Sequence, residues 1–327
     1  MNNRSSRYSF FINPVTLFIL LLVSWISAGF VPHIKAEDNW IPALTSFTDI
    51  SNLGERWSMY ISTLLLICNA ISVYAIGLRS MATGKNKFLL PLIYLLFVLI
   101  SPSALYFSGS SVSSLLILWS LYFSNKSKQS DLHFFISGFL SALAILFEPT
   151  LALLVILIVF FAFSTRGVTA RSVVMMSASV LIPFIFVLSV RYILYDDAVL
   201  FSDLFIDAVT AAYPLQFALQ NFSDLVLYLA LFITLLSAVW YIAEQRGRYK
   251  IEKAKIMTRF ILMLLIMLAI ILLYPINMTY YASVISIPVA VIMNEYLINY
   301  EKSNKHKIQW IILLTLMLVA RISEIIL

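Results

Sequence analysis

The sequence predicts an all-α protein, a polytopic bundle of transmembrane helices in which residues 1–327 form a single integral membrane domain. Hydrophobic residues make up 61% of the chain and charged residues 12%, whereas a soluble domain is nearer half apolar and a quarter charged. The apolar residues gather in long blocks, and one crossing of a hydrocarbon core takes about 20 helical residues. Short loops rich in Lys and Arg separate many of these blocks.

The basic loops predict the orientation of the bundle, because Lys and Arg are retained on the cytoplasmic side of a bacterial inner membrane. Arg4 and Arg7 precede the first apolar block, which places the N-terminus in the cytoplasm. With strict alternation, 18 of the 22 basic residues fall on the inside, and the exceptions are Lys35, Arg56, Arg191 and Arg321.

About eleven spans follow from this alternation. They cover residues 15–31, 59–78, two within 88–124, two within 134–163, then 173–195, 225–242, 260–274, 283–297 and 310–320. The first is longer than the apolar region of a signal peptide and lacks a cleavage pattern after it, so we expect it to be retained. The count falls to nine if either short hairpin is re-entrant or merges differently.

The two hairpins occupy the stretch 79–171, where each apolar block has Lys or Arg on both sides and must therefore leave and return. The first block turns at Ser101-Pro102-Ser103 and at residues 108–111. The second turns at Glu148-Pro149 and leaves room for two short spans only.

Two exterior loops have a distinct composition. In the first, apolar residues recur every third position between two tryptophans, which predicts a helix lying in the membrane interface: Trp40, Ile41, Leu44, Phe47, Ile50, Leu53 and Trp57. The second, residues 196–224, carries five Asp and no Lys or Arg, so we expect an acidic loop.

Composition also excludes several functions. The net charge of +6 reflects the basic inside loops, and without a basic stripe interleaved with aromatic residues we expect no nucleic-acid partner. One cysteine and three histidines, with no Gly-rich phosphate loop and no metal-spaced pair, predict neither a metal site nor a cofactor. Membrane lipids are the expected partners.

A few ionisable residues lie where chemistry at the outer face would need them. Asp38, beside Glu37, follows the first span, where a carboxylate could act as a general base toward an acceptor hydroxyl; a solvated loop acid is the alternative. Arg191 and Arg321 either extend to the outer interface or bind a lipid phosphate, which guanidinium binds bidentately.

Glu148 interrupts an apolar block, although an ionisable group at membrane depth costs roughly 2.5 kcal/mol or more. That cost disappears if the turn reaches the outer headgroups, as the short hairpin requires. The alternative is a role in a polar cavity.

The 79–171 stretch also has a characteristic order of turns and apolar runs. A turn at Ser101-Pro102 and a Ser-rich turn precede the run Leu-Leu-Ile-Leu-Trp-Ser-Leu-Tyr-Phe, and Gly138-Phe139-Leu140 then opens a span that ends at Glu148-Pro149. This order resembles the middle of GT-C type glycosyltransferases, which use polyprenyl-phosphate-linked sugars. With Arg259 before a long apolar span and Ile287-Pro288 in the next, the chain resembles an uncharacterised family of bacterial polytopic inner-membrane proteins of that outline.

The resemblance implies a catalytic Asp or Glu in the first exterior loop, where Asp38 and Glu37 occupy the matching place. Such enzymes often carry a second acid near the outer turn after the third span. Here that turn, residues 108–114, reads Ser-Gly-Ser-Ser-Val-Ser-Ser and contains no acid.

Two hypotheses follow. In the first, the protein transfers a sugar from a polyprenyl-phosphate donor to an acceptor at the outer face, and a groove leads to Asp38. In the second, it is a non-enzymatic envelope-biogenesis scaffold or a transporter component built on the same helical outline.

Overall fold

The computed structural model describes residues 55–80, 88–125, 130–164, 168–195, 198–210, 222–274, 281–299, 312–313 and 315–316. Every regular element in these ranges is a helix, which confirms the all-α prediction for this part of the chain. The expected first span, the interfacial helix of the first exterior loop and most of the last span lie outside the described residues.

Four helices are long and apolar enough to cross a membrane, and these mark the chain as a membrane protein. They are α2 (Glu55–Ser80), α7 (Ala170–Tyr195), α9 (Phe222–Gln245) and α10 (Ile251–Leu273). Shorter apolar helices are α3 (Leu89–Val98), α4 (Gly109–Ser124), α5 (Asp131–Phe147), α6 (Ala152–Phe163) and α11 (Ala282–Asn299). Each predicted span between residues 55 and 299 coincides with one of these helices, while the total of eleven and the orientation stay predictions.

The hairpins break at the predicted turns. Short 3-10 helices, η3 (Pro102–Leu105) and η4 (Pro149–Leu151), follow α3 and α5. Because a residue before proline is disfavoured in helical conformation, Glu148 leaves the helix at φ −147° and ψ 85°. At 1.5 Å per residue, the ten residues of α3 extend about 15 Å, half of a hydrocarbon core.

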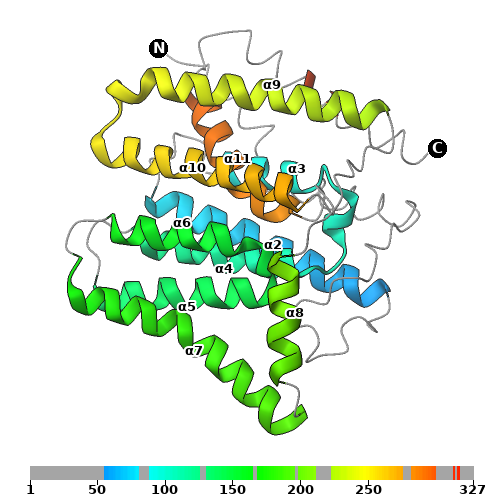
Figure 1. Ribbon diagram of the computed structural model, residues 1–327. Coiled ribbons are helices and arrows are strands. Elements are labelled where there is room, and N and C mark those ends of the chain that lie inside the picture. The colour runs from blue at the N-terminus through cyan, green and yellow to red at the C-terminus, as the bar shows by residue number, and fades with distance from the viewer. Residues whose placement is uncertain are drawn as a thin grey trace.

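In Figure 1, helices α4, α5, α6, α9 and α10 point in similar directions while α8 (Ala198–Thr210) and α11 cross them, and α9 and α7 lie along opposite edges. Nearly every residue of α3 is buried, and α11 packs against it in the centre of the bundle. By contrast, α7 and α9 expose large apolar side chains such as Phe186 and Trp240. Such surfaces suit a hydrocarbon solvent, so the apolar helices of the rim face lipid.

Small residues allow the central helices to approach closely, as is common in membrane bundles. Ser120 on α4 hydrogen-bonds both Ser137 and Ser141 on α5. On another face of α5, a Cβ on Gly138 would lie 2.1 Å from Ser179 Oγ of α7. The Ser-rich and Gly positions in this stretch therefore serve helix packing.

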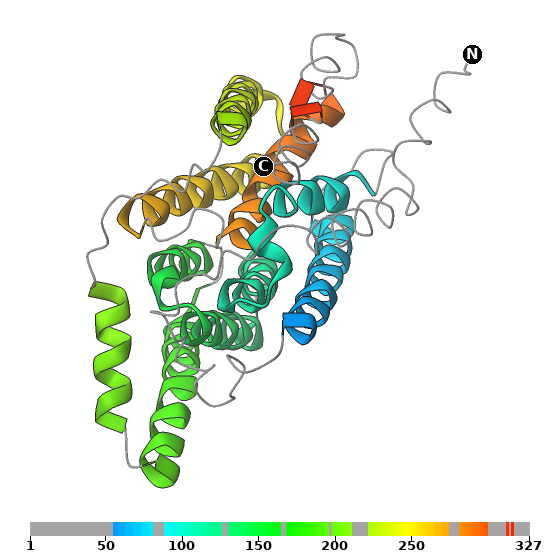
Figure 2. The same ribbon diagram turned by 90° about the vertical axis from the view of Figure 1, so that its right-hand side faces the viewer.

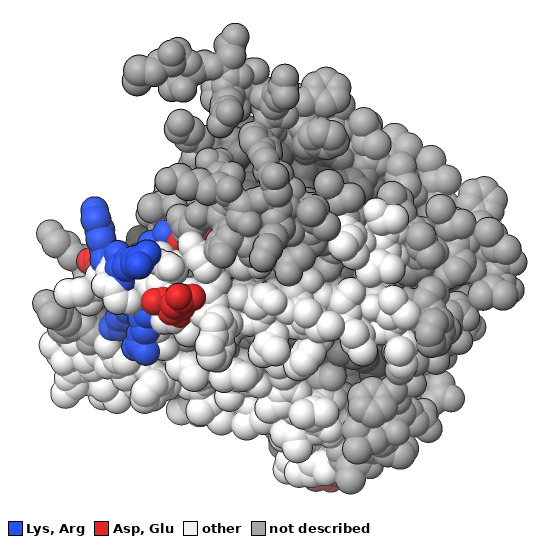
Figure 3. All heavy atoms as spheres, turned by 90° about the horizontal axis from the view of Figure 1, so that it is seen from above, with Lys and Arg blue, Asp and Glu red and all other residues white. Residues whose placement is uncertain are grey.

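The ends of the helices form two distinct faces. The first, the basic end, contains the helix ends at Ser124, Ser164, Gln245 and Ile251. These helix ends connect to the basic segments that the charge rule places in the cytoplasm. The second lies near helix α8, is called the α8 end, and contains the Glu148 turn and the beginning of α11. Of the basic side chains that the structure describes, only Arg191 lies at the α8 end. Figure 3 shows Lys and Arg gathered where α9 and α10 join, while most of the remaining described surface in that view is uncharged.

One helix was not predicted, and one predicted boundary was wrong. The acidic exterior loop contains a helix, α8 (Ala198–Thr210), and α10 begins nine residues before the expected start at Phe260. Helix α8 buries Phe201 while Asp203 and Asp207 remain exposed, a two-sided pattern that favours a helix at an interface. The start of α10 was misplaced because its lysines were assigned to a loop, although Lys is well accommodated in a helix.

Cysteine labelling tests the orientation. In a Cys68→Ala background, we expect Asp203→Cys on α8 to react with an impermeant thiol reagent in right-side-out inner-membrane vesicles, because its side chain is exposed at the predicted outer face. Ser130→Cys, exposed before α5 at the basic end, should react only after the membrane is permeabilised. Labelling of Ser130→Cys in intact vesicles would invert the assignment.

Candidate functional site

The most unusual acid in the described chain lies at the break between α5 and α6. Glu148 is 1% exposed, so its carboxylate lies within the protein. The turn is where the sequence predicts it, and α8 packs beside the 3-10 helix η4 that follows it. The side chain is enclosed by protein, whereas its depth relative to the headgroups and its role in a polar cavity stay predictions.

A chain of hydrogen bonds ends on this carboxylate. The hydroxyl of Tyr281, just before α11, donates to Thr150 Oγ1 at 2.8 Å. Thr150 in turn donates to Glu148 Oε1 at 2.5 Å. All three side chains are at most 3% exposed. Because both donors point toward the acid, the network favours a carboxylate that accepts, and it joins α11 to the break between α5 and α6.

The serine-rich turn that lacks an acid lies directly beside Glu148. The carbonyl oxygen of Ala144 accepts a hydrogen bond from Ser113 Oγ at 2.9 Å and another from the backbone N–H of Glu148 at 2.9 Å. The first turns of α4 and the end of α5 therefore meet at one atom. The packing of α4 on α5 therefore places the backbone of Glu148 near a turn that contains no acid.

Helix α8 runs across the other helices at this end of the bundle (Figures 1 and 2). The guanidinium of Arg191 lies 5.5 Å from the ring centroid of Phe201, within the distance of a cation–π contact. At the other end of α8, the hydroxyl of Tyr274 donates to the carbonyl oxygen of Val209 at 2.6 Å. Contacts at both ends thus hold α8 across the bundle.

Two of the sequence-predicted site residues lie at the same end of the bundle. Glu148 and Arg191 both lie at the α8 end, and both are buried. Asp38, Glu37 and Arg321 lie outside the described residues, so their roles stay predictions.

At the basic end, Arg259 joins three helices, a role that the sequence did not indicate. Its Nη2 donates to the carbonyl oxygen of Phe161 at 2.7 Å and to Ser164 Oγ at 2.9 Å, both on or next to α6. Its Nη1 donates to the carbonyl oxygen of Ser124 at 3.4 Å and to Asn125 Oδ1, at the end of α4. Arg259 is 5% exposed and belongs to α10.

A second buried polar contact joins α10 to α11. Lys253 Nζ lies 2.7 Å from Glu295 Oε1, and the Glu295 side chain is 4% exposed. Lys253 also lies 5.0 Å from the ring centroid of Tyr249. Burial raises the pKa of the Tyr249 phenol above its usual range, and the Glu295 carboxylate adds to the effect, so this tyrosine is neutral at physiological pH. In the sequence, the signal for this ion pair was Glu295, an acid inside the predicted 283–297 span.

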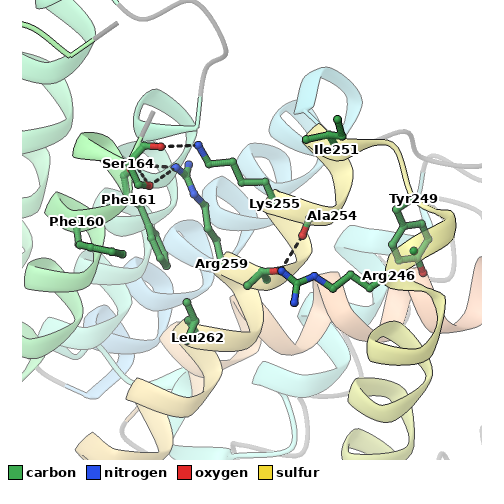
Figure 4. A pocket seen from close by; sticks show the side chains of 12 residues that line it. Phe160, Phe161, Ser164, Arg246, Tyr249, Ile251, Ala254, Lys255, Arg259 and Leu262 are labelled. Atoms are coloured by element: carbon green, nitrogen blue, oxygen red, sulfur yellow. Dashed lines mark hydrogen bonds between the residues drawn. The ribbon is translucent and has the colours of Figure 1, made fainter. Parts of the chain in front are cut away.

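Beside Arg259 the protein has a groove of about 790 Å³. Figure 4 shows Lys255 and Arg259 extending from α10 toward Ser164 on one side of it. The sequence hypothesis expects a groove at the outer face leading to Asp38, whereas this groove lies at the basic end. Among the described residues, no group of three His, Cys, Asp or Glu side chains could hold a metal ion. The absence of a metal and of a cofactor stays a prediction for the whole chain.

Together, the fold and its buried polar clusters define an all-helical membrane protein with buried polar contacts at both ends of the described bundle. The chain belongs to the family described as "Family of unknown function (DUF6427)", whose model matches residues 41–326. In the same comparisons, no curated protein and no solved structure matched the chain.

Proposed function

We propose that this protein is a GT-C-like glycosyltransferase of the bacterial inner membrane, which moves a sugar from a polyprenyl-phosphate donor to an acceptor at the outer face. The observation that carries the proposal is the buried Glu148 carboxylate at a helix break, at the end of the bundle that the charge rule assigns to the outside. A carboxylate buried away from water is costly, and acids within membrane helix bundles commonly mark functional sites.

The position of Glu148 supports the resemblance where the sequence departs from it. GT-C enzymes often carry a second acid near the outer turn after the third span, and here that turn consists of serine, glycine and valine. Through the shared acceptor on Ala144, Glu148 lies against the beginning of α4, next to the place where that acid is expected. In this proposal, the carboxylate of Glu148, directly after α5, takes the place of the acid that the turn lacks.

The roles follow from the chemistry of glycosyl transfer. Asp38, or Glu37 beside it, removes the proton from the acceptor hydroxyl, whose oxygen then forms a bond to the anomeric carbon. The bond from that carbon to the phosphate oxygen breaks, and the lipid phosphate leaves with its negative charge. Arg191 and Arg321 are the proposed ligands of this phosphate. Glu148 is suited to stabilise the positive charge that develops on the sugar ring.

One observation favours the second hypothesis, a scaffold or transporter component. Thr150 and Tyr281 hold Glu148 within the fold, as a purely structural acid would be held. The two hypotheses differ in what the charge of Glu148 does. A structural acid needs its hydrogen-bond acceptor, whereas a catalytic one also needs its negative charge.

Glu148→Gln separates the two. The amide keeps the shape and one acceptor oxygen but loses the charge, so we expect sugar transfer to fall about 10²-fold, as when one electrostatic stabiliser is removed from a site. The protein level should stay near that of the wild type. The measurement is transfer of labelled sugar from polyprenyl-phosphate donors to envelope lipids in a deletion strain complemented with each variant.

Thr150→Val is the matched control, because it removes the donor to Glu148 and keeps the acid. It should cost much less transfer than Glu148→Gln. Equal losses from the two variants, or wild-type transfer by Glu148→Gln, would leave Glu148 with a structural role only.

A further inference from the structure

Among the described residues, three cationic side chains and no acidic one line the groove at the basic end. Arg246 from the 3-10 helix η5 (Arg246–Arg248) and Lys255 and Arg259 from α10 all line it. Its volume of about 790 Å³ lies within the roughly 300–1,000 Å³ typical of ligand sites. The groove therefore combines the size of a ligand site with a strong positive charge.

Arg259 carries the strongest indication of an anion. The guanidinium is buried, yet the acceptors that the structure describes for it are neutral oxygens of two carbonyls, one amide and one hydroxyl. These bonds satisfy its N–H donors without neutralising its charge, and an unneutralised charge away from water is costly. A negative charge in the adjacent groove would lower that cost.

The groove changes from charged to apolar along α10. Lys255, Arg259 and Leu262 follow at spacings of four and three, so they share one helix face. At 1.5 Å per residue, Leu262 lies about 10 Å further along the helix axis than Lys255. The lining also includes Phe160 of α6, whose side chain is 61% exposed.

This change from a charged to an apolar lining matches the structure of a membrane lipid, which has a charged headgroup and apolar acyl chains. Leu262 and Phe160 are exposed apolar side chains of α10 and α6, and such side chains face the hydrocarbon in a membrane protein. A free phosphate ion would gain nothing from an apolar wall, whereas a lipid places a phosphate at the interface and acyl chains below it. Basic pockets between transmembrane helices on the cytoplasmic side commonly bind anionic lipid headgroups.

The geometry points to a binding site for an anionic phospholipid of the cytoplasmic leaflet. Its phosphate lies between Arg246 and Lys255, within the field of Arg259, and one acyl chain lies along Leu262 and Phe160. The site is independent of the proposed transfer at the outer face. Its occupant also joins η5, α6 and α10, so bound lipid stabilises the basic end of the bundle.

Native mass spectrometry of the detergent-purified full-length protein, titrated with phosphatidylglycerol and separately with phosphatidylcholine, tests this site. We expect a preference for phosphatidylglycerol. The double variant Arg246→Gln/Lys255→Gln should weaken phosphatidylglycerol binding about 10- to 30-fold, since each basic residue near a headgroup contributes about 1 kcal/mol and 1.4 kcal/mol is tenfold.

The matched control is Arg248→Gln/Lys250→Gln, which removes the same charge from two exposed neighbours that do not line the groove. It should change the affinity for phosphatidylglycerol less than twofold, because neither side chain lines the groove that holds the headgroup. Arg246→Gln alone leaves the contact between Lys255 and Ser164 intact and should give an intermediate loss, even if the double variant folds poorly. Equal losses from the two double variants would show general surface attraction and overturn the site. Displacement of the lipid by millimolar inorganic phosphate would assign the groove to a free anion instead.

Discussion

Replacing Arg259 by Leu is expected to remove most of the folded protein from the membrane. The guanidinium holds α10 to the ends of α4 and α6 through four acceptors. A hydrogen bond to a charged group contributes about 1.5–3 kcal/mol. Several of them together approach the whole stability of a typical protein, about 5–15 kcal/mol. The measurement is the amount of monodisperse protein after extraction, together with its thermal midpoint.

Arg248→Leu is the control for this change. It removes the same side chain from the same end of the protein, but Arg248 is exposed, and we expect wild-type yield and midpoint. Arg259→Lys should be intermediate, because one ammonium cannot reach acceptors on both α4 and α6 with the geometry of a planar fork. Normal accumulation and an unchanged midpoint for Arg259→Leu would contradict this role.

Replacing Asp38 by Asn is expected to reduce sugar transfer about 10²- to 10⁴-fold, which is the usual contribution of a general base. Asparagine has nearly the shape of aspartate but cannot accept the proton of the acceptor hydroxyl. The measurement is again transfer of labelled sugar to envelope lipids in the complemented deletion strain.

Glu37→Gln is the matched control, since it makes the same chemical change one residue away. It should cost much less if Asp38 is the base, and the reverse pattern would assign the role to Glu37. A deletion strain with normal envelope glycans, in which Asp38→Asn behaves as the wild type does, would favour the scaffold or transporter hypothesis.

Hydropathy and turn residues predicted most of the described helices, because burial in lipid imposes a length on each apolar block. Helix α7 begins three residues before the predicted span and ends with it, and the break at Glu148-Pro149 follows from the restriction that proline places on the preceding residue. Helix α8 was not predicted. It is too short to span, and its apolar side chains pack on Leu146 and Val187, which are distant in sequence.

The polar clusters were less predictable, because their partners come from helices that are far apart in the chain. The sequence placed Arg259 among the loop cations, since the charge rule counts basic residues and does not say what they contact. It located Glu148 but could not show the hydrogen-bond chain that encloses it. Thr150 is 2 residues from its acceptor Glu148, whereas Tyr281 is 131 residues from its acceptor Thr150. An acid inside an apolar block was nevertheless a usable signal at both Glu148 and Glu295.

Sugar transfer by the purified protein is the most direct test of the proposed function. The wild-type chain, reconstituted in vesicles with polyprenyl phosphate carrying a labelled hexose and with envelope lipids from the deletion strain, should move label from the polyprenyl lipid to a second lipid. Asp38→Asn and Glu148→Gln vesicles, matched for protein content, should move far less. Label that stays on the polyprenyl lipid in wild-type vesicles, while the deletion strain keeps normal envelope glycans, would contradict a transferase.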